Sequence, residues 1–185
     1  MERRKLRRTY NTPGDAHEFT WSCYRRQPFL RNQKTCNWLV EAIDKARVKH
    51  DFELWAYVFM TNHVHLLIHH RQEKYDIAVI KQAIKQSVSQ KAVAHLKKYN
   101  PAGLEAMKVV QKNGSFVYRF WQDGGGYDRN LFSPKALLKA IDYIHNNPVR
   151  SGLVESALDW KWSSVRAYQG MDHGVLHVDI CEMVL

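Results

Sequence analysis

The sequence predicts an α+β domain built on a split β-α-β-β-α-β sheet. Three observations support this prediction: an alternating stretch followed by a helical one, a central hairpin of two apolar strands, and a long amphipathic helix after that hairpin. With 185 residues, 45% of them hydrophobic, the chain can bury one core. We therefore expect one domain over residues 13–170, with a basic arm at 1–12 and a tail at 171–185.

The first strand and the first helix are predicted in the N-terminal part of the chain. Residues 17–24 alternate between polar and large apolar side chains, which is typical of a strand. Residues 31–50 place their apolar side chains at helical spacing. The apolar side chains of this predicted helix are Trp38, Leu39, Ala42, Ile43 and Ala46.

The two central strands are predicted to form a hairpin around Thr61-Asn62, a connection of the length that tight hairpins use. We expect Met60 to pair with His63. Because side chains alternate between the faces of a strand, this register defines two faces. The core face carries Trp55, Tyr57 and Phe59 beside Val64, Leu66 and Ile68. The other face carries Leu54, Ala56, Val58 and Met60 opposite His63, His65 and Leu67, which suits a shallow site covered by another element.

The remaining elements complete the predicted sheet and add a third helix. Residues 75–99 carry a long apolar stripe, and a final strand near 116–121 leaves both helices on one face and the other face free. The glycine-rich run 123–127 lacks the Gly-Lys-Ser/Thr of a phosphate-binding loop, so we interpret it as a flexible hinge. A third helix begins after Ser133 and is expected to end at Pro148.

The charge of the chain favours a polyanionic partner. The formal net charge is +10, which indicates nucleic acid first and an anionic membrane surface second, with a solvated basic surface as the plain alternative. Basic residues interleave with Trp160 and Trp162 in the C-terminal part, a pattern that suits unpaired bases or that pins the tail to the domain. The candidate contacts to a nucleic-acid backbone are Arg3, Arg4, Arg7, Arg8, Arg25, Arg26 and Arg150.

Cysteine usage and hydropathy indicate a reducing compartment. Cys23, Cys36 and Cys181 are widely spread and form neither a disulfide framework nor a zinc knuckle. The basic N-terminus precedes no apolar signal region, and no stretch approaches the length of a membrane span. We expect a cytoplasmic protein that is neither secreted nor membrane-spanning.

Two sets of residues are candidates for chemistry. His63 and His65 stand at alternate positions of a strand, so their Cα atoms lie about 6.6–6.8 Å apart and both rings can reach one metal ion. The spacing alone is equally typical of a strand without a site, and the plainer interpretation is that they are ordinary histidines on a half-exposed face. Tyr143 falls on the flank of the third apolar stripe with Asn147 one turn later, although a tyrosine there can simply pack against the sheet.

Several blocks of the sequence together resemble the REP-associated tyrosine transposases, which belong with the single-tyrosine HUH transposases of insertion sequences. These blocks lie at 59–67, 120–122, 143–154 and 159–164, and the most specific is Tyr143-Ile144-His145-Asn146-Asn147-Pro148-Val149. The resemblance extends over residues 13–168. It implies a ferredoxin-like sheet with an added C-terminal helix that carries the tyrosine.

The resemblance also implies a site and a reaction. His63 and His65 become ligands of Mg²⁺ or Mn²⁺, and Tyr143 becomes the nucleophile. Related transposases place a glutamine one turn after the tyrosine; here Asn147 stands there, so the third ligand is Asn147, His145 or water. The implied substrate is single-stranded DNA with hairpins, cleaved and rejoined through a 5′-phosphotyrosine by a monomer or a homodimer. A domesticated, non-catalytic nucleic-acid-binding protein and a metal-dependent hydrolase are the alternatives.

Overall fold

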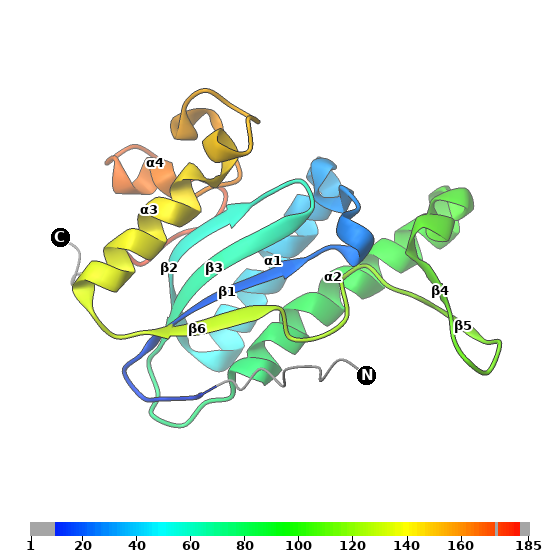
Figure 1. Cartoon of the computed structure of the whole chain (residues 1–185), viewed down its shortest axis with the longest axis horizontal. Helices are drawn as coiled ribbons and strands as arrows, with labels where there is room; N and C mark the ends of the chain where they lie inside the picture. The colour runs from blue at the N-terminus through cyan, green and yellow to red at the C-terminus, as the bar shows by residue number, and fades with distance from the viewer. Residues whose placement is uncertain (1–9, 173, 182–185) are drawn as a thin grey trace, which may run out of the picture.

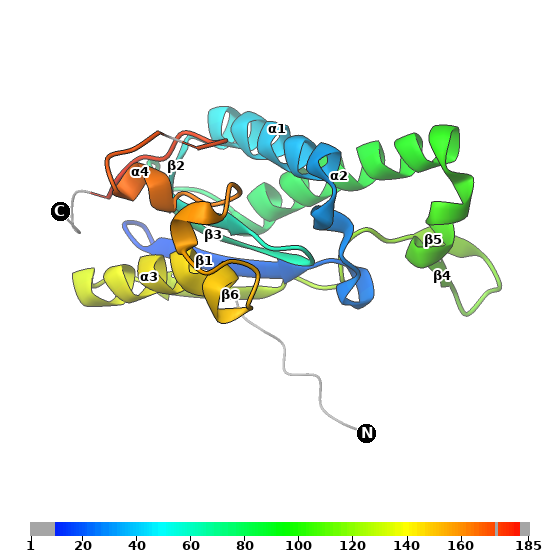
Figure 2. The same ribbon diagram turned by 90° about the horizontal axis from the view of Figure 1, so that it is seen from above.

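A computed structural model of the chain describes residues 10–172 and 174–181. One four-stranded antiparallel sheet has the order β2-β3-β1-β6, and three long helices cover it. Figures 1 and 2 show α1 and α2 on one face of the sheet and α3 on the other. These seven elements are β1 (Ala16–Ser22), α1 (Gln33–His50), β2 (Phe52–Phe59), β3 (His63–His70), α2 (Ile77–Tyr99), β6 (Tyr127–Leu131) and α3 (Pro134–Arg150).

The element order β1-α1-β2-β3-α2-β6 confirms the predicted split β-α-β-β-α-β fold with an added helix. The smaller elements join these parts. They are the 3₁₀ turns η1 (Tyr24–Arg26), η2 (Phe29–Arg31), η3 (Pro101–Met107) and η4 (Ala157–Asp159), the strands β4 (Lys108–Val110) and β5 (Phe116–Tyr118), and the short helix α4 (Val165–Tyr168). None of the helices within the described ranges is both long and apolar enough to cross a bilayer.

The predicted position of the last sheet strand is wrong. Residues 116–118 form β5, which pairs with β4 in a separate hairpin beyond the far end of α2 (Figure 1). The fourth strand is instead β6, whose sequence is too polar to show an apolar alternation. It is held by polar partners on β1: Arg129 pairs with Glu18, and Asp128 contacts the buried ring of His17.

The central hairpin has the predicted register at its turn and a different one further along. Met60 N–H donates to the carbonyl of His63 over 2.8 Å, as expected. A β-bulge between Leu54 and Ala56 then reverses the alternation, because one extra residue on β2 opposes β3. Leu54 therefore joins the main core, and Trp55 turns to the opposite face, where its ring stacks on His69 at a centroid distance of 4.7 Å.

The third helix begins as predicted and ends later than predicted. The Ser133 hydroxyl accepts a hydrogen bond from Ala136 N–H, and Pro134 is the first helical residue. The prediction that Pro148 ends the helix is wrong: α3 continues to Arg150, and Leu153 N–H donates to the Pro148 carbonyl over 2.9 Å. Proline lacks an N–H donor and crowds the carbonyl four residues earlier, but its own carbonyl can still accept a hydrogen bond from downstream.

The apolar stripe of α3 covers the sheet face that carries the histidines. The prediction that this face is free is therefore wrong. The expectation that another element covers the apolar shelf is confirmed. The second apolar cluster forms between helix and sheet, and its members include Leu137, Ala140, Ile141 and Ile144 from α3 and Ala56, Val58, Met60 and Leu67 from the hairpin.

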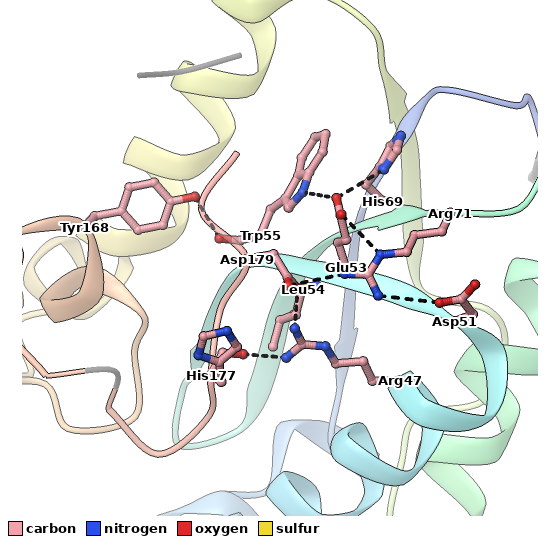
Figure 3. A network of polar contacts seen from close by, with 10 residues as sticks. All are labelled: Arg47, Asp51, Glu53, Leu54, Trp55, His69, Arg71, Tyr168, His177 and Asp179. Carbon is pink, nitrogen blue, oxygen red and sulfur yellow. Dashed lines mark hydrogen bonds and ion pairs between the residues drawn. The ribbon is translucent and has the colours of Figure 1, made fainter. Parts of the chain in front are cut away.

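The C-terminal segment closes the exposed edge of β2. Phe59 N–H donates to the Trp162 carbonyl over 2.8 Å, and Asp179 and Leu54 exchange two bonds, each 2.9 Å long. Figure 3 shows Asp179 between Leu54 and the guanidinium of Arg47, with which it forms an ion pair. β2 would otherwise expose unpaired backbone groups at the edge of the sheet, and these contacts cover part of that edge.

Gly126, the residue before β6, lies closer to another backbone segment than any other described glycine. Its φ is +72°, and a Cβ there would lie 2.1 Å from the carbonyl oxygen of Thr20. We expect Gly126→Ala to lower the free energy of unfolding by about 2–4 kcal/mol, because it adds both a clash and a disfavoured backbone conformation. Gly125→Ala is the matched control, since a Cβ at Gly125 meets nothing within 4 Å. Urea unfolding measures both variants, and equal losses of stability would contradict this explanation.

Candidate functional site

His63 and His65 lie side by side on β3 and face α3. Alternate residues of a strand share one face, so Val64 between them points into the main core. The two imidazole centroids are 5.0 Å apart, with the rings nearly perpendicular. The predicted histidine pair is therefore close enough for both rings to contact one small ligand.

The ring of His65 is oriented by the neighbouring strand. Thr20 on β1 is its cross-strand partner, and Thr20 Oγ1 lies 2.7 Å from His65 Nδ1. Nε2 of His65 is buried and has no hydrogen-bond partner within residues 10–172 and 174–181. An unsatisfied buried nitrogen costs about 1–3 kcal/mol, so this atom is prepared for a ligand that the chain itself does not supply.

The ring of His63 is oriented by its neighbour in the turn. His63 Nδ1 lies 2.7 Å from Asn62 Oδ1. An amide oxygen can only accept, so Nδ1 carries the proton and donates. The lone pair of His63 is therefore on Nε2.

Burial keeps both histidines neutral. Desolvation, with a smaller contribution from the charge of Arg26, lowers the pKa of His63 to about 4. Desolvation and the proximity of His63 lower the pKa of His65 to about 3. At neutral pH both rings thus keep the lone pair that a metal ligand needs.

Helix α3 brings Tyr143 over the same histidines. The Tyr143 and His65 ring centroids are 5.6 Å apart at an angle of 80°. Tyr143 is 38% exposed, so its phenol is open to a macromolecular substrate. The guanidinium carbon of Arg150, two turns along α3, lies 5.0 Å from the Tyr143 ring centroid. A nucleophile candidate, a histidine pair and a cation therefore meet in one place.

The two side chains proposed from the sequence as a third ligand differ in their surroundings. Asn147 is buried one turn after Tyr143, and its Nδ2 donates to the Tyr143 carbonyl over 2.8 Å. His145 instead points to the other side of α3, where its Nε2 lies 2.8 Å from Ser164 Oγ. In the described part of the chain no three His, Cys, Asp or Glu side chains form a group that could hold a metal ion.

Arg25 and Arg26 follow β1, and the charge of Arg26 acts on His63. Arg25 and Arg26 have φ values of 50° and 53°, an uncommon conformation for residues other than glycine. Asn62 ties this segment to the hairpin turn, because its Nδ2 donates to the Arg26 carbonyl over 3.3 Å. The other proposed DNA contacts, Arg3, Arg4, Arg7 and Arg8, lie outside the described residues.

Sequence reasoning missed the two residues that orient the imidazoles. Asn62 could have been found from its position next to His63 in the turn. Thr20 could not, because the pairing of β1 with β3 joins residues far apart in the chain.

Comparisons with known proteins bear on the family and the fold of the chain. The family model described as "Transposase IS200 like" matches residues 15–147. A Haemophilus influenzae protein, named provisionally as a REP-associated tyrosine transposase, is 26% identical over 113 residues, which cover 61% of this chain and 58% of the relative. The match thus spans less than two thirds of that relative.

Two solved structures also resemble the chain. The structure of a REP-associated tyrosine transposase bound to a REP hairpin has a TM-score of 0.69 and 22% identity, and the match covers 96% of this chain and 94% of that one. This likeness supports the fold. A transposase-like protein from Deinococcus radiodurans matches with a TM-score of 0.45 and 16% identity, covering 76% of this chain and 97% of the other.

Burial of His65 predicts a distinctive titration. We expect its ring to stay neutral in metal-free protein down to about pH 4, whereas a histidine in the unfolded chain protonates near pH 6.5. The unfolded state then binds the proton first, so the contribution of His65 to stability is full above pH 6.5 and is lost as the pH falls towards 3. Ring ¹⁵N shifts in chelator-containing buffer measure this, with denatured protein as the reference. A His65 midpoint near 6.5 would contradict the burial argument.

Proposed function

The chain belongs to the family of IS200-like transposases, and on this premise we propose that it cleaves and rejoins single-stranded DNA beside hairpins, with Tyr143 as the nucleophile. One observation supports this most directly. The Tyr143 ring lies 5.6 Å from the ring of His65, whose buried Nε2 lacks a partner among the residues described. An exposed phenol beside a prepared ligand atom suits transfer of a phosphodiester to tyrosine.

The proposed cleavage exchanges one phosphoester for another. The Tyr143 phenol loses its proton as its oxygen bonds to phosphorus, and the bond from phosphorus to the 3′ oxygen breaks. That oxygen leaves with the bonding electron pair and takes up a proton, which gives a 5′-phosphotyrosine and a free 3′-hydroxyl. Attack by a 3′-hydroxyl reverses these steps and rejoins a strand. The number of phosphoester bonds is unchanged, so no ATP is required.

His63 and His65 fit a divalent cation, because the buried Nε2 of His65 lacks a partner within the described ranges and Nε2 of His63 carries a lone pair. The amide oxygen of Asn147 is the proposed third ligand. A bound Mg²⁺ or Mn²⁺ would polarise the scissile phosphate and stabilise the charge that develops on it. Two imidazoles favour Mn²⁺ over Mg²⁺.

Three of the proposed DNA contacts, Arg25, Arg26 and Arg150, lie in the described part of the chain, close to Tyr143 or to the hairpin turn. Arg150 stacks on the Tyr143 ring, and Arg25 and Arg26 follow β1 next to the hairpin turn. The four arginines of the N-terminal arm would add contacts to the backbone. Hairpin DNA is proposed as the substrate because the solved relative is bound to a REP hairpin. Tyr143 and the histidines meet within one chain, so the proposed site is compatible with a monomer.

A non-catalytic DNA-binding protein of the same fold is the second candidate. Two observations favour it. Asn147 already uses its amide nitrogen on the Tyr143 carbonyl, and the described residues offer no third histidine, cysteine or carboxylate beside the pair. This candidate predicts DNA binding without a covalent product.

The nucleophile can be tested by trapping the adduct. We expect wild-type protein, incubated with hairpin-bearing single-stranded DNA and Mn²⁺, to form a covalent protein–DNA species on a denaturing gel. Tyr143→Phe should form none while binding the same DNA with similar affinity, because only the phenolic oxygen is removed. Tyr118→Phe is the control, because Tyr118 lies on β5, far from the histidines. This variant should form the adduct normally. An adduct that persists in Tyr143→Phe would exclude Tyr143.

The metal site can be tested through the residue that orients His65. Thr20→Val removes the hydroxyl beside His65 Nδ1, and we expect it to weaken Mn²⁺ binding about 10–100-fold, as loss of an outer-sphere partner does. Calorimetric titration with Mn²⁺ measures the affinity, with the exposed Thr12→Val as control. Excess EDTA should abolish the adduct as well. Unchanged Mn²⁺ affinity in Thr20→Val, or full cleavage in EDTA, would contradict the proposed metal role.

A further inference from the structure

We propose that a hollow between α1 and α2 is a second DNA subsite, which holds unpaired nucleotides that flank the hairpin. The inference rests on the proposed function, because it assumes that single-stranded DNA is the substrate. The hollow has a volume of about 480 Å³, within the usual range of about 300–1,000 Å³ for ligand sites. We call it the α1–α2 hollow; the residues that matter in its lining are Phe29, Arg31, Lys34, Trp38, His95 and Phe120.

The aromatic side chains of the hollow suit nucleobases. Trp38 and His95 meet edge to face with ring centroids 5.5 Å apart, and Phe29 and Phe120 form a second pair at 5.1 Å. Trp38, His95 and Phe29 are only half-buried, so part of each ring is open. Stacking of a base on such a ring is favourable and accepts any base, because every base has a π-face.

The cations of the hollow are available for phosphate. Arg31 and Lys34 are exposed, and over residues 10–172 and 174–181 neither side chain has an ion pair or a hydrogen bond. A neighbouring hollow along α2 has similar composition, but its cations are engaged within the protein. Lys81 pairs with Asp128 at 2.7 Å, and Lys85 donates to the Gly124 carbonyl at 3.0 Å. Charge complementarity to a polyanion therefore favours the α1–α2 hollow.

The wall of the hollow is joined to the hairpin turn that carries His63. Leu30 N–H donates to the Thr61 carbonyl over 3.0 Å, and Cys23 N–H donates to the Asn62 carbonyl over 2.8 Å. Figure 1 shows this segment, in blue after β1, between the end of the β2–β3 hairpin and the far half of α2. The segment from Cys23 to Leu30 also contains Arg25 and Arg26, two of the proposed backbone-contacting arginines. The hollow and the histidine pair are thus joined by one stretch of backbone, along which we expect a strand leaving Tyr143 to run.

The charge of the subsite is tested with two DNAs that share one hairpin, one with single-stranded flanks and one blunt. We expect the double variant Arg31→Ala/Lys34→Ala to bind the flanked DNA about tenfold more weakly. The slope of log affinity against log salt should fall by about 1.4, since each contacted phosphate of a single strand contributes about 0.7. Affinity for the blunt hairpin should not change. Lys45→Ala/Lys49→Ala removes the same charge from the other end of α1 and should leave both affinities unchanged.

The stacking is tested by combining Trp38→Leu with flanks whose bases have been removed. Wild-type protein should bind the abasic flank more weakly than the intact one. Trp38→Leu should bind the DNA with the intact flank more weakly than wild-type protein does. The ratio of the affinities for the intact and the abasic flank should also be smaller, because the ring on which the base stacks is gone. Blunt-hairpin affinity reports whether this variant is folded. If Trp38→Leu is not folded, the Arg31→Ala/Lys34→Ala variant alone tests the subsite.

Three outcomes would overturn the subsite. They are equal losses on flanked and blunt DNA, no loss on either, or the same loss in the Lys45/Lys49 control. If wild-type protein forms the Tyr143 adduct and binds the blunt hairpin but ignores the flank, the subsite is wrong and the proposed function stands. If wild-type protein binds neither DNA, both fail.

Discussion

The packing of α3 across the sheet is the interaction on which the candidate site depends. Small side chains on both sides, Ala140 on the helix and Ala56 and Val58 on β2, let the helix lie close to the strands. Because the apolar stripe of α3 packs against the sheet, Tyr143 on the flank of that stripe contacts His65. The same packing desolvates the imidazoles and keeps them neutral. One apolar contact therefore determines the position, the exposure and the protonation of the proposed catalytic groups.

The outer strand β6 is held to the rest of the protein largely by polar contacts. β6 is fastened to β1 and α2 through Asp128, which contacts His17 and forms an ion pair with Lys81. The hydrogen bonds and charges lower the pKa of Asp128 despite its desolvation, so the carboxylate stays charged. Because β6 leads directly into α3, this buried network also anchors the element that carries Tyr143.

The resemblance to REP-associated tyrosine transposases is confirmed by the comparisons, whereas the roles of the site residues remain proposals.

Much of this arrangement could be predicted from the sequence, and the failures have physical causes. The β2–β3 turn, the face of the histidine pair and the start of α3 follow from short-range chemistry that is visible in the chain. The sequence predicts the wrong face for Trp55, because a bulge leaves no mark in an apolar run. β6 was missed because its partners are charged. Thr20 was missed because only long-range strand pairing brings it to His65.

The closure of the β2 edge by Asp179 and by the segment around Trp162 has a consequence for folding. β2 is synthesised long before these residues, so during translation its outer backbone groups have no partner. The nascent sheet therefore has an edge that can add a strand from another molecule, and chaperone binding at this stage would protect it. Once the C-terminal segment has docked, that edge is closed to strand addition. The order of synthesis thus makes the docking of residues 162–179 the step that closes this edge.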